Sequence, residues 1–163
     1  MKAPETPADE IQRLAKLHAL QVLDTLPEER FDRITRIAKR LFDVPIVLVS
    51  LVDQDRQWFK SCQGLDVSET PRDISLCGHA ILGSDPFIVE DTALDPRFSN
   101  NPLVTSEPFI LFYAGYPLML GDGSAVGTLC IIDHQVRSFT PQDLQLFKDI
   151  GRIAESELGL DSF

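Results

Sequence analysis

Two apolar stretches in the second half of the chain decide its fold: ILFYAGYPL at residues 110–118 and AVGTLCIID at residues 125–133. Between them stands Gly121-Asp122-Gly123-Ser124, and an Asp-Gly pair is typical of tight hairpin turns because both residues tolerate positive φ. We therefore predict that the two stretches form an antiparallel ribbon. Since both strands are apolar throughout, other parts of the chain must cover both faces of the ribbon.

The first strand of this ribbon presents two different sets of side chains. Successive residues of a strand point to opposite faces, so Phe112 and Tyr116 share one face, while Tyr113 and Gly115 share the other. Only one of these sets can face a ligand pocket. The sequence leaves open which set it is.

Helices are predicted at both ends of the chain. Thr6 followed by Pro7 is a helix start, and this helix should run to about Leu23. Its apolar residues are spaced three apart, so they wind around the helix axis. This pattern suits a helix that contacts both the domain and a second subunit, or a helix that packs only into the core of its own domain. Capping-box patterns at residues 25–28 and 140–143 begin two further helices, which should end before Pro45 and at about Leu158.

The remaining segments predict a sheet with short elements over it. Residues 46–52 are a continuous apolar run, typical of a central strand, and residues 56–62 return as a second strand. A short helix is expected over residues 74–81 and a short strand over 87–89, whereas residues 91–102 have no clear period and are expected to form a lid or binding loop. We predict one α+β domain of 163 residues, with an antiparallel sheet backed by helices from both ends.

Composition argues against several classes of function. The net charge of −10, from 15 basic and 25 acidic residues, disfavours nucleic acid as a partner. No apolar run approaches the ~20 residues of a membrane span and no signal peptide begins the chain, so we expect no membrane contact and a cytoplasmic protein. Cys62, Cys77 and Cys130 are widely spaced, as reduced thiols are, and the three scattered histidines argue against a metal site.

Several stretches, taken jointly, resemble the GAF domain family, in particular the bacterial GAF domains found alone or ahead of signalling modules. They are residues 31–41, 44–53, 56–60 (RQWFK), 75–81 (SLCGHAI), 95–98 (DPRF) with 101–104 (NPLV), 112–118, and 127–133. The resemblance covers about residues 9–158, nearly the whole chain. It implies a PAS-like fold with a five- or six-stranded antiparallel sheet, terminal helices on one face, and short helices and loops over a small-molecule pocket on the other.

The resemblance and the apolar ribbon together suggest a set of ligand-pocket residues. They are Cys77, His79, Asp91, Arg97, Phe98, Phe112, Tyr113 and Tyr116. Arg97 is suited either to clamp a ligand carboxylate or to pair with Asp91 or Asp95 and fix the loop. Bilin attachment at Cys77 is not expected, because Gly78 separates it from His79 and residues two apart on a helix point about 200° apart. The cofactor and the ligand stay unassigned.

We expect a non-catalytic sensory or regulatory domain of signal transduction. The resemblance implies that it binds a small molecule, forms a homodimer through its N- and C-terminal helices, and passes the ligand state to a separate signalling effector protein. Two alternatives stay open. One is a thiol-dependent enzyme of the free methionine sulfoxide reductase type, which requires cysteines that meet in space. The other is a dimerisation module whose pocket is filled by its own side chains.

Overall fold

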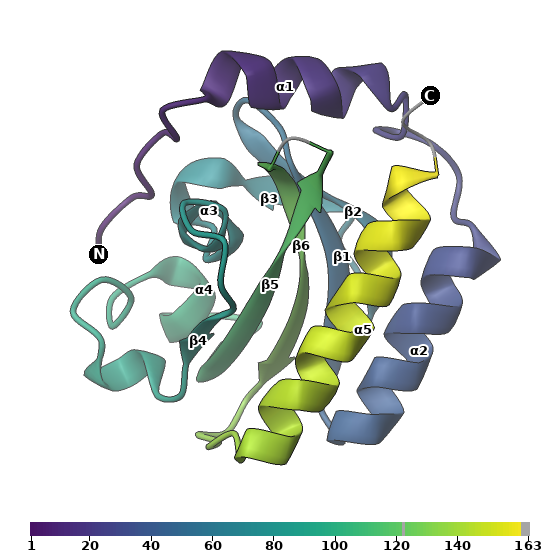
Figure 1. The fold of residues 1–163 in the computed structure, drawn as a ribbon. Helices are drawn as coiled ribbons and strands as arrows, with labels where there is room; N and C mark the ends of the chain where they lie inside the picture. The colour runs from purple at the N-terminus through teal and green to yellow at the C-terminus, as the bar shows by residue number, and fades with distance from the viewer. Residues whose placement is uncertain (122, 161–163) are drawn as a thin grey trace.

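The computed structural model describes residues 1–121 and 123–160, so Asp122 of the predicted turn lies outside the described residues. The predicted α+β plan is confirmed: six antiparallel strands form one sheet in the order β3-β2-β1-β6-β5-β4 (Figure 1). The strands are β1 Ile46–Val52, β2 Arg56–Gln63, β3 Glu69–Pro71, β4 Phe87–Val89, β5 Phe112–Leu120 and β6 Ser124–Asp133. The helices are α1 Glu10–Ala19, α2 Glu29–Phe42, α3 Cys77–Ala80, α4 Pro102–Thr105 and α5 Pro141–Gly159, with single 3₁₀ turns η1 Arg72–Ile74 and η2 Thr92–Leu94.

The predicted ribbon is the pair of strands β5 and β6. Their register runs from Phe112 opposite Asp133 to Leu120 opposite Ser124, with one irregularity after Leu118. Strand β6 then pairs with the central strand β1 so closely that a Cβ atom on Gly127 would lie 2.1 Å from the carbonyl oxygen of Ser50. A glycine at position 127 is therefore what allows the ribbon to join the rest of the sheet.

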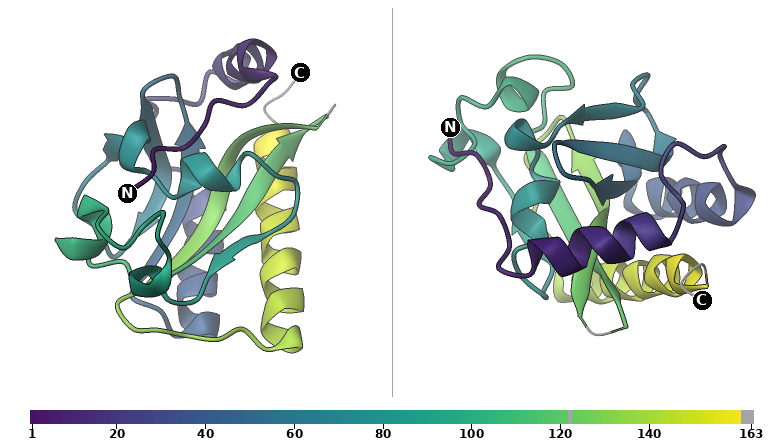
Figure 2. Two further views of the ribbon diagram at one scale, coloured as in Figure 1. Left: turned by 90° about the vertical axis from the view of Figure 1, so that its left-hand side faces the viewer. Right: turned by 90° about the horizontal axis from the view of Figure 1, so that it is seen from above.

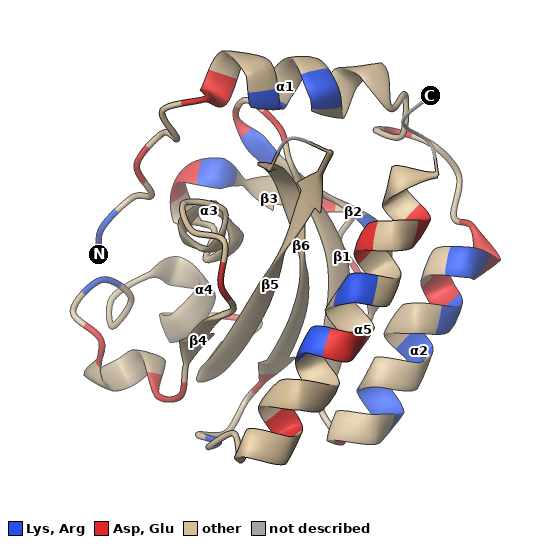
Figure 3. Cartoon of the chain, viewed as in Figure 1, with Lys and Arg blue, Asp and Glu red and all other residues tan. Residues whose placement is uncertain are grey.

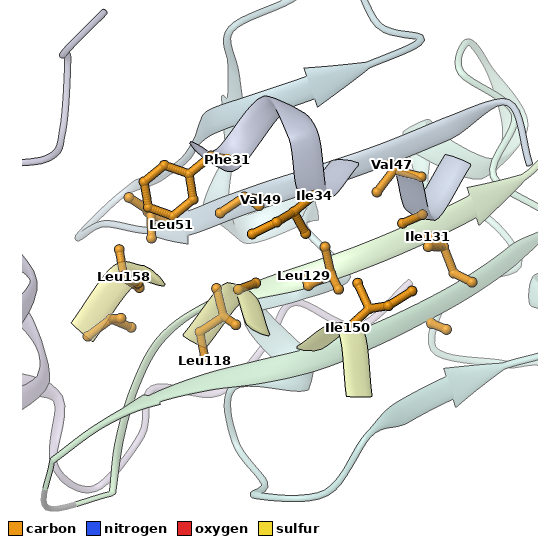
Figure 4. Close-up of a cluster of buried hydrophobic side chains, with 14 of the residues drawn as sticks. Phe31, Ile34, Val47, Val49, Leu51, Leu118, Leu129, Ile131, Ile150 and Leu158 are labelled. Atoms are coloured by element: carbon orange, nitrogen blue, oxygen red, sulfur yellow. The ribbon is translucent and has the colours of Figure 1, made fainter. Parts of the chain in front are cut away.

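Helices α2 and α5 lie side by side on one face of the sheet (Figures 1 and 2). Figure 4 shows side chains from both helices meeting those of the strands. Buried residues of β1, β5 and β6 supply the sheet side of this core, and they include Val49, Leu118 and Leu129. Phe31 of α2 and Leu158 of α5 close it from the helix side, each with no exposed surface.

Two of the three predicted helix starts are wrong in position, and each has a local reason. Helix α1 begins at Glu10 and ends at Ala19, because residues 8 and 9 form a turn and Gln21 adopts a positive φ. The Thr25 hydroxyl donates to the carbonyl oxygen of Val22 and does not cap α2, which begins four residues later. The third start is confirmed, since Thr140 and Asp143 form the expected capping box of α5.

The opposite face of the sheet is covered by short elements. Helices α3 and α4 and their connecting loops lie over β1, β5 and β6 there (Figure 2). Residues 69–71 form the edge strand β3 beside β2. The stretch 91–102 contains only the η2 turn and the start of α4, as its lack of a period predicted. Among the described residues, no helix is long and apolar enough to cross a bilayer.

Helix α1 lies across one end of the sheet and is held there by a buried arginine (Figure 1). The Arg13 side chain has no exposed surface, and its guanidinium donates to the carbonyl oxygens of Val52 at 2.7 Å and Ala125 at 3.5 Å. Glu10 pairs with both Arg13 and Arg72. Burial alone would raise the pKa of Glu10, but hydrogen bonds from Arg72 and Arg13 outweigh it and lower this pKa from 4.5 to about 2.

We expect Glu10→Gln to change how the stability of the protein depends on acid. Because the pKa of Glu10 is lower in the folded state, its ionised form stabilises folding above pH 4.5, and this contribution is lost as the pH falls toward about 2. Urea unfolding at a series of acidic pH values should show a shallower loss of stability in Glu10→Gln. The exposed Glu5 serves as the control. Equal acid dependence in Glu10→Gln and the parent would contradict the burial of this ion pair.

Candidate functional site

A cavity of about 220 Å³ lies on the α3 face of the sheet. Strands β1, β2, β5 and β6 form its floor, and α3, α4 and the loops around residues 66 and 107 form its walls. Most of the lining is apolar. The lining residues are Leu48, Gln57, Phe59, Leu65, Asp66, Val67, Thr70, Leu76, Cys77, Leu103, Glu107, Pro108, Ile110, Tyr113 and Ile132.

Beside this cavity, three side chains meet around the sulfur of Cys77, which lines the cavity together with Tyr113. The Tyr113 hydroxyl and the Thr128 hydroxyl each donate to Cys77 Sγ at 3.1 Å, and Cys130 Sγ lies 3.9 Å from it. Cys77 comes from α3, while the other three residues come from the ribbon. We call these four residues the thiol cluster.

The position of Tyr113 depends on the glycine two residues further along the same strand. A Cβ atom at Gly115 would lie 2.4 Å from the Tyr113 hydroxyl oxygen, so only glycine lets the ring lie back along β5. The ring thereby reaches Cys77 and carries its hydroxyl to the sulfur. Gly115 is in this sense part of the site, although it offers no chemical group.

The two buried thiols of the cluster differ in their acidity. Burial would raise the pKa of Cys77, but hydrogen bonds from Cys130, Thr128, Tyr113 and Ser50 lower it to about 7. Burial raises the pKa of Cys130 well above its usual value, and the neighbouring Cys77 sulfur adds to this increase. Burial likewise raises the pKa of Tyr113, so its hydroxyl keeps its proton. Cys77 is therefore the group of the cluster that ionises first.

Of the residues predicted to line a pocket, the structure brings Cys77 and Tyr113 to the cavity. His79, Arg97 and Phe98 lie together in a neighbouring aromatic group instead. The His79 ring packs 4.9 Å from Phe98, and the Arg97 guanidinium lies 5.0 Å from the same ring. Arg97 pairs with Asp95 at 2.7 Å, so this loop carboxylate takes the position that a ligand carboxylate was expected to fill.

The other three predicted residues lie away from the cavity. The Asp91 side chain caps the η2 turn by accepting from the backbone N–H of Ala93. Phe112 and Tyr116 point to the helix face, where Phe112 is part of the core and Tyr116 packs against Phe147 of α5. The prediction placed residues of both alternating sets of β5 in one pocket, and the structure corrects this. Successive side chains of a strand point to opposite faces, and only the set that contains Tyr113 faces α3.

Several residues of the site were not among the predicted ones. Thr128 and Cys130 could have been found, because they stand opposite Pro117 and Gly115 in the register of the hairpin and so share the face of Tyr113. Asp66 and Glu107 at the cavity had no such signal, since both lie in loops. Within residues 1–121 and 123–160, no group of three or more side chains is suited to hold a metal ion.

The antiparallel sheet, the helices α2 and α5 on one face and the cavity under short elements on the other define a class of small α+β domains with a PAS-like fold. A family model described as "GAF domain" matches residues 26–158. The chain belongs to the GAF domain family, as its sequence predicted.

A curated relative is the cyclic di-GMP phosphodiesterase PA2567 of Pseudomonas aeruginosa, which is 40% identical over 159 residues. The alignment covers 97% of this chain but 27% of the relative, so the chain spans about a quarter of that protein. Because residues 1–25 lie outside the family match while nearly all of the chain aligns with the relative, the likeness extends to the N-terminal segment.

Solved structures confirm the fold. The free methionine-R-sulfoxide reductase of Neisseria meningitidis has a TM-score of 0.65 at 20% identity, covering 99% of this chain and 98% of that chain. The GAF domain of the Acinetobacter phosphoenolpyruvate-protein phosphotransferase has a TM-score of 0.62 at 14% identity, covering 92% of each chain. At these identities the likeness concerns the fold alone.

We expect Thr128→Val to raise the pKa of Cys77 from about 7 toward its usual value of 9.0, because a donor to the sulfur is lost. The rate of Cys77 alkylation as a function of pH measures this pKa, in a Cys62→Ser background that removes the half-buried third thiol. Thr35→Val is the matched control, since Thr35 is equally buried but bonds Ser61. A parent protein whose Cys77 titrates near 9.0 would contradict the described cluster.

Proposed function

We propose that this chain is a non-catalytic sensory domain that binds a small molecule in the cavity under α3 and α4. The observation that carries this proposal is an apolar cavity of about 220 Å³ with hydrogen-bonding groups at its floor. Sites for small molecules are concave and mostly apolar, with a few polar groups that orient the ligand. The cavity also argues against a domain whose pocket is filled by its own side chains.

The lining favours a particular kind of ligand. A molecule of this size would place an apolar body against Leu48, Leu103 and Ile132. Two acidic residues, Asp66 and Glu107, are also part of the lining; both are exposed to solvent, and neither pairs with a Lys or Arg within the part of the chain that the structure describes. Opposite charge attracts at such a site, so we propose a small, largely apolar ligand that carries a positively charged or proton-donating group.

We expect such a ligand to stabilise the protein against heat. A ligand at about 100 times its Kd adds about 2.7 kcal/mol to the free energy of unfolding. A thermal-shift screen of small amines and uncharged metabolites, together with native mass spectrometry of freshly purified protein, measures this effect.

Leu103→Trp should abolish the shift because the larger side chain fills the cavity, whereas Leu94→Trp is the matched control on an exposed leucine of the same face. A screen without any shift, on protein that carries no bound mass, would overturn the proposal.

We further propose that the output leaves through the terminal helices, in a cytoplasmic homodimer that acts on a signalling partner. The three cysteines are free thiols, which suits a reducing compartment. Helix α2 exposes Ile37 and Leu41 beside a row of basic residues, and α5 exposes Ile153 beside residues of both signs (Figure 3). Pairing α2 of one copy with α5 of a second would bury these apolar side chains and join opposite charges.

We expect the double variant Ile37→Glu with Ile153→Glu to sediment as a monomer at concentrations where the parent is a dimer. About half of the surface of each isoleucine is exposed, and the proposed partner would cover it. A glutamate at either position would instead place an unpaired carboxylate in the interface, which is costly. Leu94→Glu, on the opposite face, should stay dimeric. A parent that sediments as a monomer, or a double variant that stays dimeric, would refute this interface.

The contact of Cys77 with Cys130 favours one second candidate, a free methionine sulfoxide reductase. Reduction of a sulfoxide needs a thiolate that reaches the substrate and a second thiol that closes a disulfide. The reductase reading expects NADPH consumption with thioredoxin and free methionine sulfoxide, lost in Cys77→Ser and retained in Cys62→Ser. An inactive parent protein excludes this candidate.

A further inference from the structure

We propose that Cys77 and Cys130 form a hydroperoxide-reactive dithiol site beside the cavity. Their Sγ atoms lie 3.9 Å apart, although the two residues come from α3 and β6. A disulfide bond is about 2 Å long, so the sulfurs must approach each other by about 2 Å to form one. Both are free thiols in the structure. The site does not depend on a ligand in the cavity.

The two thiols are not equivalent toward an oxidant. Both thiols are buried, but Cys77 is among the residues that line the cavity and Cys130 is not. A small peroxide that enters the cavity therefore meets Cys77 first. The Tyr113 and Thr128 hydroxyls both donate to the Cys77 sulfur, which stabilises the thiolate, and the thiolate is the form that attacks.

The acidity of the pair agrees with this order. The pKa of Cys77 is lowered to about 7 by its hydrogen bonds against the effect of burial, while burial raises the pKa of Cys130. At neutral pH Cys77 is partly ionised and Cys130 keeps its proton. Cys77 is then the attacking thiol, and Cys130 the resolving thiol.

The reaction balances with hydrogen peroxide as the oxidant. The Cys77 thiol loses its proton, the thiolate attacks one peroxide oxygen, and the O–O bond breaks. The hydroxide that leaves takes up the proton that Cys77 released and becomes water, so Cys77 is left as a sulfenic acid. The Cys130 thiol then attacks the Cys77 sulfur, the S–S bond forms, the S–O bond breaks, and the Cys130 proton leaves with the oxygen as a second water. Two thiols are oxidised to one disulfide, and one peroxide is reduced to two waters.

Closing this bond would act on the N-terminal segment. The residues that follow Cys77 in α3 contact the N-terminal segment. A ring nitrogen of His79 lies 3.1 Å from the carbonyl oxygen of Lys2, and a Cβ atom at Gly78 would lie 2.7 Å from Pro4. Drawing Cys77 toward β6 would shift the part of α3 that Lys2 and Pro4 contact. The oxidation state of the dithiol site is thereby linked to the segment that leads into α1.

The test treats the reduced full chain with one equivalent of hydrogen peroxide, removes the excess with catalase, and alkylates the denatured protein before mass spectrometry. We expect two of the three thiols to resist alkylation and a peptide pair joining Cys77 to Cys130. Cys62→Ser should form the same disulfide. Cys130→Ser should stop at a sulfenic acid on Cys77, which dimedone traps.

If Cys130→Ser does not fold, Thr128→Val tests the proposal in its place, because it keeps both cysteines. We expect Thr128→Val to slow disulfide formation several-fold at neutral pH. Three alkylatable thiols after treatment, a disulfide that contains Cys62, or a dimedone adduct on Cys130 would each overturn the proposal. A disulfide formed with free methionine sulfoxide but not with hydrogen peroxide would also overturn it and would support the reductase candidate. Ligand binding is measured on the reduced protein, so the two proposals can fail separately.

Discussion

The burial of the β5–β6 ribbon on both faces is the constraint on which the rest of the structure depends. One face, with Phe112, Leu118 and Leu129, packs against the long helices α2 and α5, which fill the space above it. The other face, with Tyr113 and Cys130, has only short helices and loops to cover it. Short elements leave gaps that regular helices do not, and the cavity lies on that side.

On the face of the ribbon that the short elements cover, the arrangement of the site depends on one glycine. Gly115 lets the Tyr113 ring lie along the strand, and the ring brings its hydroxyl to Cys77. The same face of β6 supplies Thr128 and Cys130. A buried sulfur would ordinarily resist ionisation, and the donors around Cys77 reverse that tendency. The packing of Tyr113 against Gly115 thus helps to determine which thiol is the more acidic.

Sequence patterns could predict the sheet, its terminal helices and the two faces of β5, because strand alternation and helix periodicity are local properties. Alternation alone left open whether the set of Tyr113 or that of Phe112 faces the cavity, and Cys77 was suggested by the family resemblance. The capping pattern at Thr25 failed since a competing bond to the carbonyl oxygen of Val22 is equally local. The contact of Cys77 with Cys130 spans 53 positions and depends on how α3 docks, which no local pattern encodes.

The central claim is that the α3 face of the ribbon encloses a real apolar cavity with the thiol cluster beside it. A crystal of the reduced protein pressurised with xenon tests this directly, because xenon enters empty apolar cavities. We expect xenon density between Leu103, Tyr113 and Ile132, or in its place the density of a co-purified small molecule. Side chains of the protein itself filling that space would contradict the account.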